Sequence, residues 1–247
     1  MTEQIKGKLN WISAVIIAVA LLGASYIAAN GFIKTRVQPN TITVTGSAKK
    51  QIKSDYVTWK GSFSTQAVKL ADAYSALESN LAKVKAYLSS KGLTDSDYTI
   101  SSVMIQVNYQ ILGNGMYSSN IESYRLTRDV DIKSGDIDKI TTISRESTQM
   151  IQDGVQFQSM PPEYFYTKIA DLKIDMLGMA TADARNRAEK IAENAGSKLG
   201  SLKNAKMGVF QITPINSNDV SDYGINDTSS IDKEIMAVVN CVFETGQ

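Results

Sequence analysis

The sequence predicts an α+β protein with an apolar helix near its N-terminus. Three observations support this expectation. Paired segments with alternating apolar residues predict strands, segments with apolar residues three to four positions apart predict helices, and an uncharged run extends from Leu9 to Ile33. The expected order, β-β-α-β-β-α-β-α-β-β, differs from the strict alternation of a parallel nucleotide-binding sheet. With 247 residues, the chain can form one mid-sized domain or two small ones.

The uncharged run over 9–33 predicts a single transmembrane helix. It is longer than the roughly 20 apolar residues that cross a bilayer, and aromatic residues lie near both of its ends. A cleaved signal peptide is the alternative, although its apolar core usually has only about 7–15 residues. The side chains expected to contact lipid are Trp11, Ile12, Ile16, Leu21, Leu22 and Tyr26.

This reading divides the chain into three parts. A short tail and anchor helix occupy 1–33, a linker occupies 34–40, and an α+β domain occupies 41–247, with 41–133 and 134–247 as candidate subdomains. Positive charges are equally numerous on both sides of the run, so they do not determine its orientation. We expect a single-pass protein of the inner (cytoplasmic) membrane, with its C-terminal domain on the periplasmic or extracellular side.

Two strands and a helix are expected at the start of the domain. Apolar residues alternate with polar ones from Ile42 and again from Val57, as in strands with one wet face. From about Ala67 the apolar period changes to three to four residues, which predicts a helix. That helix should end at Lys91-Gly92, because glycine readily adopts the left-handed conformation that closes a helix.

A long hairpin should follow. The segments 99–109 and 124–132 both alternate apolar and polar residues, and the loop Leu112–Asn120 between them contains Asn114-Gly115, a turn signal. Further along, Asp136 marks a second helix start, and a short strand is expected at Val155–Phe157. A third helix should run from Asp171 to Gly196, with strands near Val209–Ile212 and Ile235–Phe243.

Several of these segments resemble one known family. They are the opening strand Ile42–Gly46, the helix end Lys91–Leu93, the late helix Ala180–Ala192, and the continuation Ala195–Gly200. The late run, A-R-x-x-A-E-x-x-A-x-x-x-G-x-x-L-G, is the most specific part. Together these segments resemble the SIMPL-domain family of exported bacterial proteins, and the resemblance extends from about Thr41 to Glu244.

The resemblance implies a SIMPL-type domain of hairpin-connected strands with three helices packed on the sheet. It also implies a location outside the cytoplasmic membrane and assembly into ring- or cage-like homo-oligomers. Family members are linked loosely to envelope and oxidative-stress tolerance, and no catalytic residues can be carried over. An anchor helix would distinguish this chain from the soluble members.

Composition excludes most enzyme chemistries. The chain contains no histidine, which rules out Ser-His-Asp and Cys-His catalysis and His-ligated metals, and its one cysteine rules out an intramolecular disulfide. The formal charge of +1 argues against a nucleic-acid partner. We therefore expect no catalytic residues, no cofactor and no metal. A hydrolase using Ser/Lys or a lone carboxylate remains a minor alternative.

Other polar groups have structural interpretations. The carboxylate pairs are expected to be solvated or to cap turns and helices, and Cys241 is expected in the core on the last strand. The acidic loop Asn216–Asp227 offers oxygen ligands that would suit calcium, but its spacing matches no calcium-loop signature. The pairs are Asp95/Asp97, Asp129/Asp131 and Asp136/Asp138.

A short aromatic segment next to two prolines is the first candidate for a partner surface, and the hairpin tip is the second. Aromatic residues and methionine are enriched at interface cores, whereas an edge strand packed on its own helix is the structural alternative. We expect a non-enzymatic envelope scaffold or stress-tolerance factor whose partners are the bilayer at 9–33, other copies and other envelope proteins. The alternative is an exported binding module in which the loop 214–230 gates a pocket. The interface candidates are Met160, Pro161, Pro162, Tyr164, Phe165 and Tyr166, with Asn114, Met116 and Tyr117.

Overall fold

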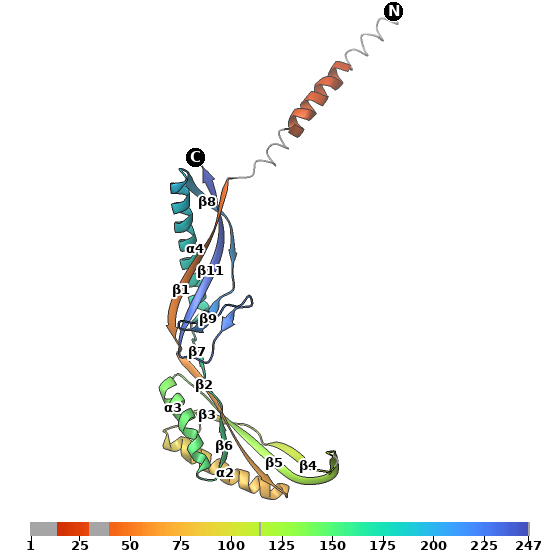
Figure 1. Cartoon of the computed structure of the whole chain (residues 1–247), viewed down its shortest axis with the longest axis vertical. Helices are drawn as coiled ribbons and strands as arrows, with labels where there is room; N and C mark the ends of the chain where they lie inside the picture. The colour runs from red at the N-terminus through yellow and green to blue at the C-terminus, as the bar shows by residue number, and fades with distance from the viewer. Residues whose placement is uncertain (1–13, 30–39, 114, 247) are drawn as a thin grey trace, which may run out of the picture. The chain divides into compact units, whose positions relative to one another are not determined.

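Runs of strands separated by helices give the chain an α+β arrangement. This computed structural model describes residues 14–29, 40–113 and 115–246 (Figure 1). After a helix over 14–29, the elements are β1 (Thr41–Lys53), β2 (Tyr56–Ala67), α2 (Leu70–Ser90), β3 (Tyr98–Ile100), β4 (Met104–Ile111), β5 (Tyr117–Ser134), α3 (Ile137–Glu146), η1 (Ser147–Ile151), β6 (Gln156–Ser159), β7 (Glu163–Phe165), α4 (Ile169–Asn194), β8 (Lys198–Met207), β9 (Gln211–Pro214), β10 (Ile225–Asn226) and β11 (Asp232–Gly246).

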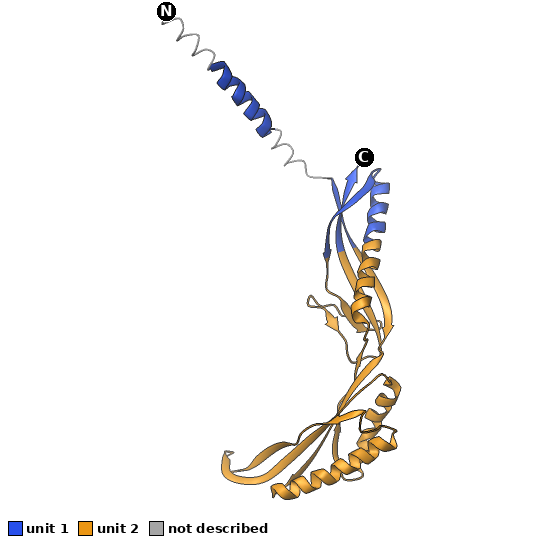
Figure 2. Ribbon diagram, turned by 180° about the vertical axis from the view of Figure 1, so that it is seen from behind, with its two compact units in different colours: residues 1–45, 184–206, 240–247 blue, residues 46–183, 207–239 orange. Residues whose placement is uncertain are grey.

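The strands form two sheets. One sheet has the order β1-β11-β9-β10, with β8 also paired to β11, and the other has the order β3-β5-β2-β6, with β4 on β5 and β7 on β2. The chain divides into two compact units, coloured in Figure 2. Unit 1 comprises 1–45, 184–206 and 240–247, and unit 2 comprises 46–183 and 207–239.

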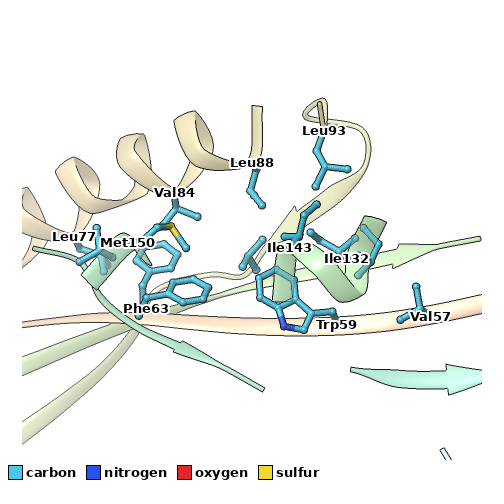
Figure 3. Packing of buried hydrophobic residues seen from close by; sticks show 14 of the residues in the cluster. Val57, Trp59, Phe63, Leu77, Val84, Leu88, Leu93, Ile132, Ile143 and Met150 are labelled. Carbon is cyan, nitrogen blue, oxygen red and sulfur yellow. The ribbon is translucent and has the colours of Figure 1, made fainter. Parts of the chain in front are cut away.

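The hydrophobic core of unit 2 lies between the second sheet and the helices α2 and α3. Strand β2 pairs antiparallel with β5, so that Trp59 lies opposite Ile132 and both side chains are buried. Helix α2 contributes Leu77, Val84 and Leu88 at helical spacing to the same cluster (Figure 3). Helix α3 packs on β2 and β5, and Asp136 caps its first turn by accepting a hydrogen bond from the Lys139 backbone N–H at 3.1 Å.

Helix α4 lies against the other sheet. Its buried residues recur at three-to-four spacing, as the sequence predicts. The Ser47 backbone N–H of β1 donates to an Asp183 carboxylate oxygen on α4 at 2.8 Å. The buried stripe consists of Leu172, Met176, Ala180, Ala184, Ala188 and Ala192.

The prediction of a transmembrane helix over 9–33 is wrong for the residues that the structure describes. None of the helices within 14–29, 40–113 and 115–246 is both long and apolar enough to cross a membrane. Trp11 and Ile12 lie outside the described residues. The other predicted lipid contacts, Ile16, Leu21, Leu22 and Tyr26, are exposed.

Two strand predictions also need correction. The segment 99–109 forms two strands, because the chain leaves the ladder between β3 and β4, where Ser101 exchanges hydrogen bonds with the backbone of Asp129. Strand β8 was not predicted, since its side chains are almost all exposed and show no alternation of apolar and polar residues.

Candidate binding groove and hairpin arm

A groove lies on the face of the second sheet that is opposite the core. Thr58 of β2 pairs with Lys133 of β5, and Lys60 pairs with Asp131. Because successive side chains of a strand point to opposite faces, these four face away from the buried Trp59. The floor of the groove is therefore polar and carries charges of both signs.

The main wall consists of the segment between β6 and β7. Both strands pair with the same edge of β2, β6 at Gly61–Ser64 and β7 at Tyr56–Thr58. Between them the chain contains Pro161-Pro162, which cannot donate backbone hydrogen bonds to the ladder. The wall begins where the Met160 backbone N–H donates to the Lys60 carbonyl at 2.9 Å. Phe165 extends the wall.

Thr228 and Ser229, at the end of the loop 214–230, line the groove beside β7, and this end of the loop is tied down. The Tyr164 backbone N–H donates to the Thr228 carbonyl at 2.8 Å. The Asp227 carboxylate accepts from the Ser229 backbone N–H at 2.9 Å and from its hydroxyl at 2.6 Å. These bonds hold the end of the loop against β7.

A buried lysine strengthens this attachment. Lys233 is only 2% exposed, and its Nζ donates to the Tyr164 carbonyl at 2.7 Å and to the Asp227 carbonyl. Burial disfavours the charged amine and lowers the pKa of Lys233, although the nearby Asp227 charge opposes the shift. The Lys233 ammonium and the Ser229 hydroxyl thus both make hydrogen bonds that hold the loop in place.

The groove has a volume of about 730 Å³, within the range of roughly 300–1,000 Å³ typical of ligand sites. Lys60 forms an ion pair with Asp129 at 2.8 Å, which raises the pKa of Lys60 and keeps it charged. Apolar walls over a floor of mixed charge suit binding by shape. The groove is lined by Thr58, Trp59, Lys60, Asp131, Ile132, Lys133, Met160, Pro161, Pro162, Glu163, Phe165, Thr228 and Ser229.

The aromatic segment divides between the groove and the interior. Met160, Pro161, Pro162 and Phe165 line the groove. Tyr164 is buried, and its hydroxyl hydrogen-bonds with the Thr141 hydroxyl of α3 at 3.0 Å. Tyr166 lines a separate cavity of about 90 Å³ beside Lys233. The sequence did not single out Thr58, Lys60, Asp131 or Lys133; the alternation of polar residues on β2 and β5 was the available signal.

The second candidate surface is a hairpin that extends past the end of α2 in Figures 1 and 2. We call residues 104–113 and 115–124 the arm. Ile105 lies opposite Leu126 and Val107 opposite Tyr124, so these side chains share the core-facing side of the sheet. Beyond two irregularities in register, Ile111 lies opposite Tyr117. The apolar side of the sheet thus continues into the arm.

The arm exposes large apolar side chains. Its turn is closed by a hydrogen bond from the Leu112 backbone N–H to the Met116 carbonyl at 2.8 Å and contains Gly115 at a φ of 81°. Met116 and Tyr117 are exposed, and Asn114 lies outside the described residues. The exposed set is Met104, Ile105, Tyr109, Ile111, Leu112, Met116, Tyr117 and Ile121.

The remaining polar candidates have structural partners. Asp97 accepts from the Thr94 backbone N–H at 2.7 Å, Asp95 accepts from the Tyr98 hydroxyl, and Asp136 caps α3. Cys241 is buried in β11, as predicted, and burial raises the pKa of its thiol. Within 14–29, 40–113 and 115–246, no three carboxylate or thiol side chains are grouped as metal ligands.

A comparison with protein families identifies the chain. The SIMPL profile, described as a protein of unknown function (DUF541), matches residues 42–243. The chain belongs to the SIMPL family. This confirms the resemblance noted from the late alanine-rich helix, which is α4, and both candidate surfaces of this SIMPL domain lie within the matched residues. A search of the curated proteins returns no match.

Proposed function

We propose that this SIMPL protein is an exported, non-enzymatic envelope scaffold or stress-tolerance factor that assembles into a homo-oligomeric ring or cage. The observation that supports it is the arm, whose apolar side continues from the core of unit 2 but is exposed. Monomeric soluble proteins rarely expose contiguous apolar patches of more than a few hundred Å². A partner that covers the arm would remove this area from water.

The size of the exposed set fits a protein partner. A fully exposed aromatic side chain presents about 150–250 Å², so eight large side chains at roughly half to three-quarters exposure present on the order of 800 Å². A standard protein–protein interface buries about 800 Å² on each partner. Met104 and Ile105 are consecutive in β4 and face opposite sides of the hairpin, so a partner must enclose both sides of the arm to bury an area of this size.

A role without catalysis is supported by the polar groups of the groove. Catalysis by a serine or a carboxylate needs a nucleophile and a base that converge on a substrate. Here the Ser229 hydroxyl donates to Asp227, and the Lys233 ammonium donates to backbone carbonyls. Export is part of this proposal because the sequence resembles the SIMPL-domain family of exported bacterial proteins.

The test is the mass of the full chain in mild detergent, measured by sedimentation velocity at micromolar concentration. We expect one discrete multiple of the mass of a single chain. A single population at the mass of one chain would overturn the proposal. Far-UV circular dichroism of the same sample establishes that the measured species is folded.

The groove favours a second candidate, an exported binding module. A cavity of about 730 Å³ with apolar walls and polar groups at its floor is the usual form of a ligand site. The probe is anilinonaphthalene sulfonate, which fluoresces in apolar sites. We expect less fluorescence from Phe165→Ser than from the control Val220→Ser, whose side chain is exposed outside the groove. Equal fluorescence from both variants would contradict this function.

A further inference from the structure

We propose that the arm tip of one copy inserts into the groove of a second copy. The tip comprises Ile111, Leu112, Met116 and Tyr117, and the groove is the one walled by Met160, Pro161-Pro162 and Phe165. This inference rests on the proposed self-assembly and specifies its contact. It differs from a symmetric contact between two arms, because it joins two unlike surfaces.

The geometry of β5 prevents the tip from reaching the groove of its own chain. Tyr117 begins this strand, and Asp131 lines the groove 14 residues later. At about 3.3 Å per residue the two positions lie on the order of 45 Å apart along one continuous strand. Because β5 is held in register by β2 along Tyr124–Ser134, it cannot fold back on itself. Only another copy can bring a tip to the groove.

The two surfaces agree in size and in character. The tip presents four large apolar side chains, of which Tyr117 is 74% and Ile111 is 65% exposed. The groove offers apolar walls and about 730 Å³, a space that accommodates a ligand of comparable size. A tight turn also directs backbone N–H and C=O groups outward. Among the residues that line the groove, Glu163 can accept from such groups and Lys133 can donate to them.

Charge also favours this pairing. The chain carries no charged side chain between Asp97 and Glu122, so the tip is uncharged. The charges that line the groove cancel: the two positive charges belong to Lys60 and Lys133, and the two negative charges belong to Asp131 and Glu163. An uncharged tip entering a groove without net charge meets no long-range repulsion. Many copies can therefore associate without accumulating charge at their contacts.

The contact has a consequence for symmetry. A contact between two unlike surfaces leaves one free tip and one free groove on every pair, so each copy can bind two neighbours. Such head-to-tail contacts close into a ring when the rotation between neighbours allows it, and otherwise they propagate as a filament. A symmetric contact between two arms would stop at a dimer.

The experiment uses one tip variant and two groove variants of the full chain. Tyr117→Asp places a charge on the tip, Phe165→Asp places one on the wall, and Thr58→Trp fills the floor while leaving Phe165 in place as a check on folding. The matched control is Tyr223→Asp, which changes an aromatic residue that is 98% exposed and lies outside both surfaces. Sedimentation and static light scattering report assembly, and circular dichroism reports folding.

We expect each tip or groove variant alone to be monomeric and the Tyr223→Asp control to assemble like the unaltered chain. Mixing the tip variant with either groove variant should restore a one-to-one dimer, because the intact tip of one enters the intact groove of the other. The mixture is examined from micromolar to millimolar concentration. A single contact binds more weakly than the linked contacts of a closed ring, so the dimer needs a higher protein concentration to form.

The outcomes separate this contact from the proposed function. If the unaltered chain is monomeric, self-assembly itself fails, and this contact fails with it. If the unaltered chain assembles but the groove variants assemble equally well, the groove is not used and the contact is wrong. If the tip and groove variants are monomeric and their mixture remains monomeric over the whole concentration range, the contact is also wrong.

Discussion

The two halves of β5 have similar sequence patterns but different surroundings. In the half that pairs with β2, Leu126, Val130 and Ile132 alternate with polar residues and are essentially fully buried. In the arm, Ile121 is 43% exposed and Tyr117 is 74% exposed. The difference follows from length. The 18 residues of β5 extend about 60 Å, whereas the 21 residues of α2 extend only about 31 Å. Alternation determines which side of a strand is apolar, but another element must cover that side.

The largest expected effect contrasts a core side chain with one on the arm. Phe63 is fully buried between β2 and α2, so Phe63→Ala should lower the free energy of unfolding by about 3–5 kcal/mol. Tyr117→Ala should change it by less than about 0.5 kcal/mol, because that side chain is mostly exposed. Urea denaturation measures both variants. Equal losses would mean that the arm is packed as tightly as the core.

The next largest effect concerns Lys233, the buried lysine that holds the loop beside the groove. Lys233→Met leaves the Tyr164 and Asp227 carbonyls without their donor and should cost about 2 kcal/mol of stability. Burial lowers the pKa of Lys233 in the folded state. At pH values between this folded-state pKa and 10.5, the unfolded state therefore binds more protons than the folded state does. The cost of burying the charge is fully present below that pKa.

Stability should therefore rise as pH increases through the folded-state pKa of Lys233 toward 10.5. Thermal unfolding of the unaltered chain and of Lys233→Met at several alkaline pH values provides the measurement. The variant should lose this contribution. A rise that is the same in both proteins would exclude Lys233 as its source.

Two glycines provide a smaller contrast. A Cβ on Gly61 would lie 2.3 Å from the Phe157 ring atom Cζ, so Gly61→Ala should displace this buried ring and cost about 1–2 kcal/mol. A Cβ on Gly113 in the arm would meet no atom within 4 Å, so Gly113→Ala should leave stability nearly unchanged. Denaturation midpoints distinguish the two. A loss at Gly113 would mean that the arm is more crowded than its exposure indicates.

The smallest expected effect concerns salt. Raising the ionic strength from about 0.1 to about 1 M shortens the screening length from ~10 to ~3 Å and weakens contacts between exposed charges. The tip carries no charge, so the assembled mass should persist across this range in sedimentation experiments. Dissociation at high salt would instead assign the contact to charged side chains.

Segments with a strong apolar period were predictable from the sequence. The period of α2, the alanine stripe of α4 and the core position of Cys241 all follow from spacing, because burial on one face requires it. The N-terminal prediction rested on the composition of one uncharged run, and no helix among the described residues is long and apolar enough to cross a membrane. Strand β8 was missed because it has no buried face to produce a pattern.

The groove depends on information that spacing does not contain. The sequence shows three consecutive aromatic residues, Tyr164, Phe165 and Tyr166, and does not say which of them is buried. The register of β7 with β2 directs Tyr164 inward, while Phe165 lines the groove. The groove floor likewise requires the pairing of Thr58 with Lys133 and of Lys60 with Asp131, residues more than 70 positions apart. Pairings between such distant residues are set by tertiary packing.

The position of Cys241 has a practical consequence. It is the one thiol of the chain and is fully buried in β11, so a maleimide dye added to the folded protein should leave it unlabelled. A cysteine introduced on the surface would then carry the fluorophore alone. Energy transfer between donor- and acceptor-labelled copies could follow subunit exchange in real time without removing the native sulfur.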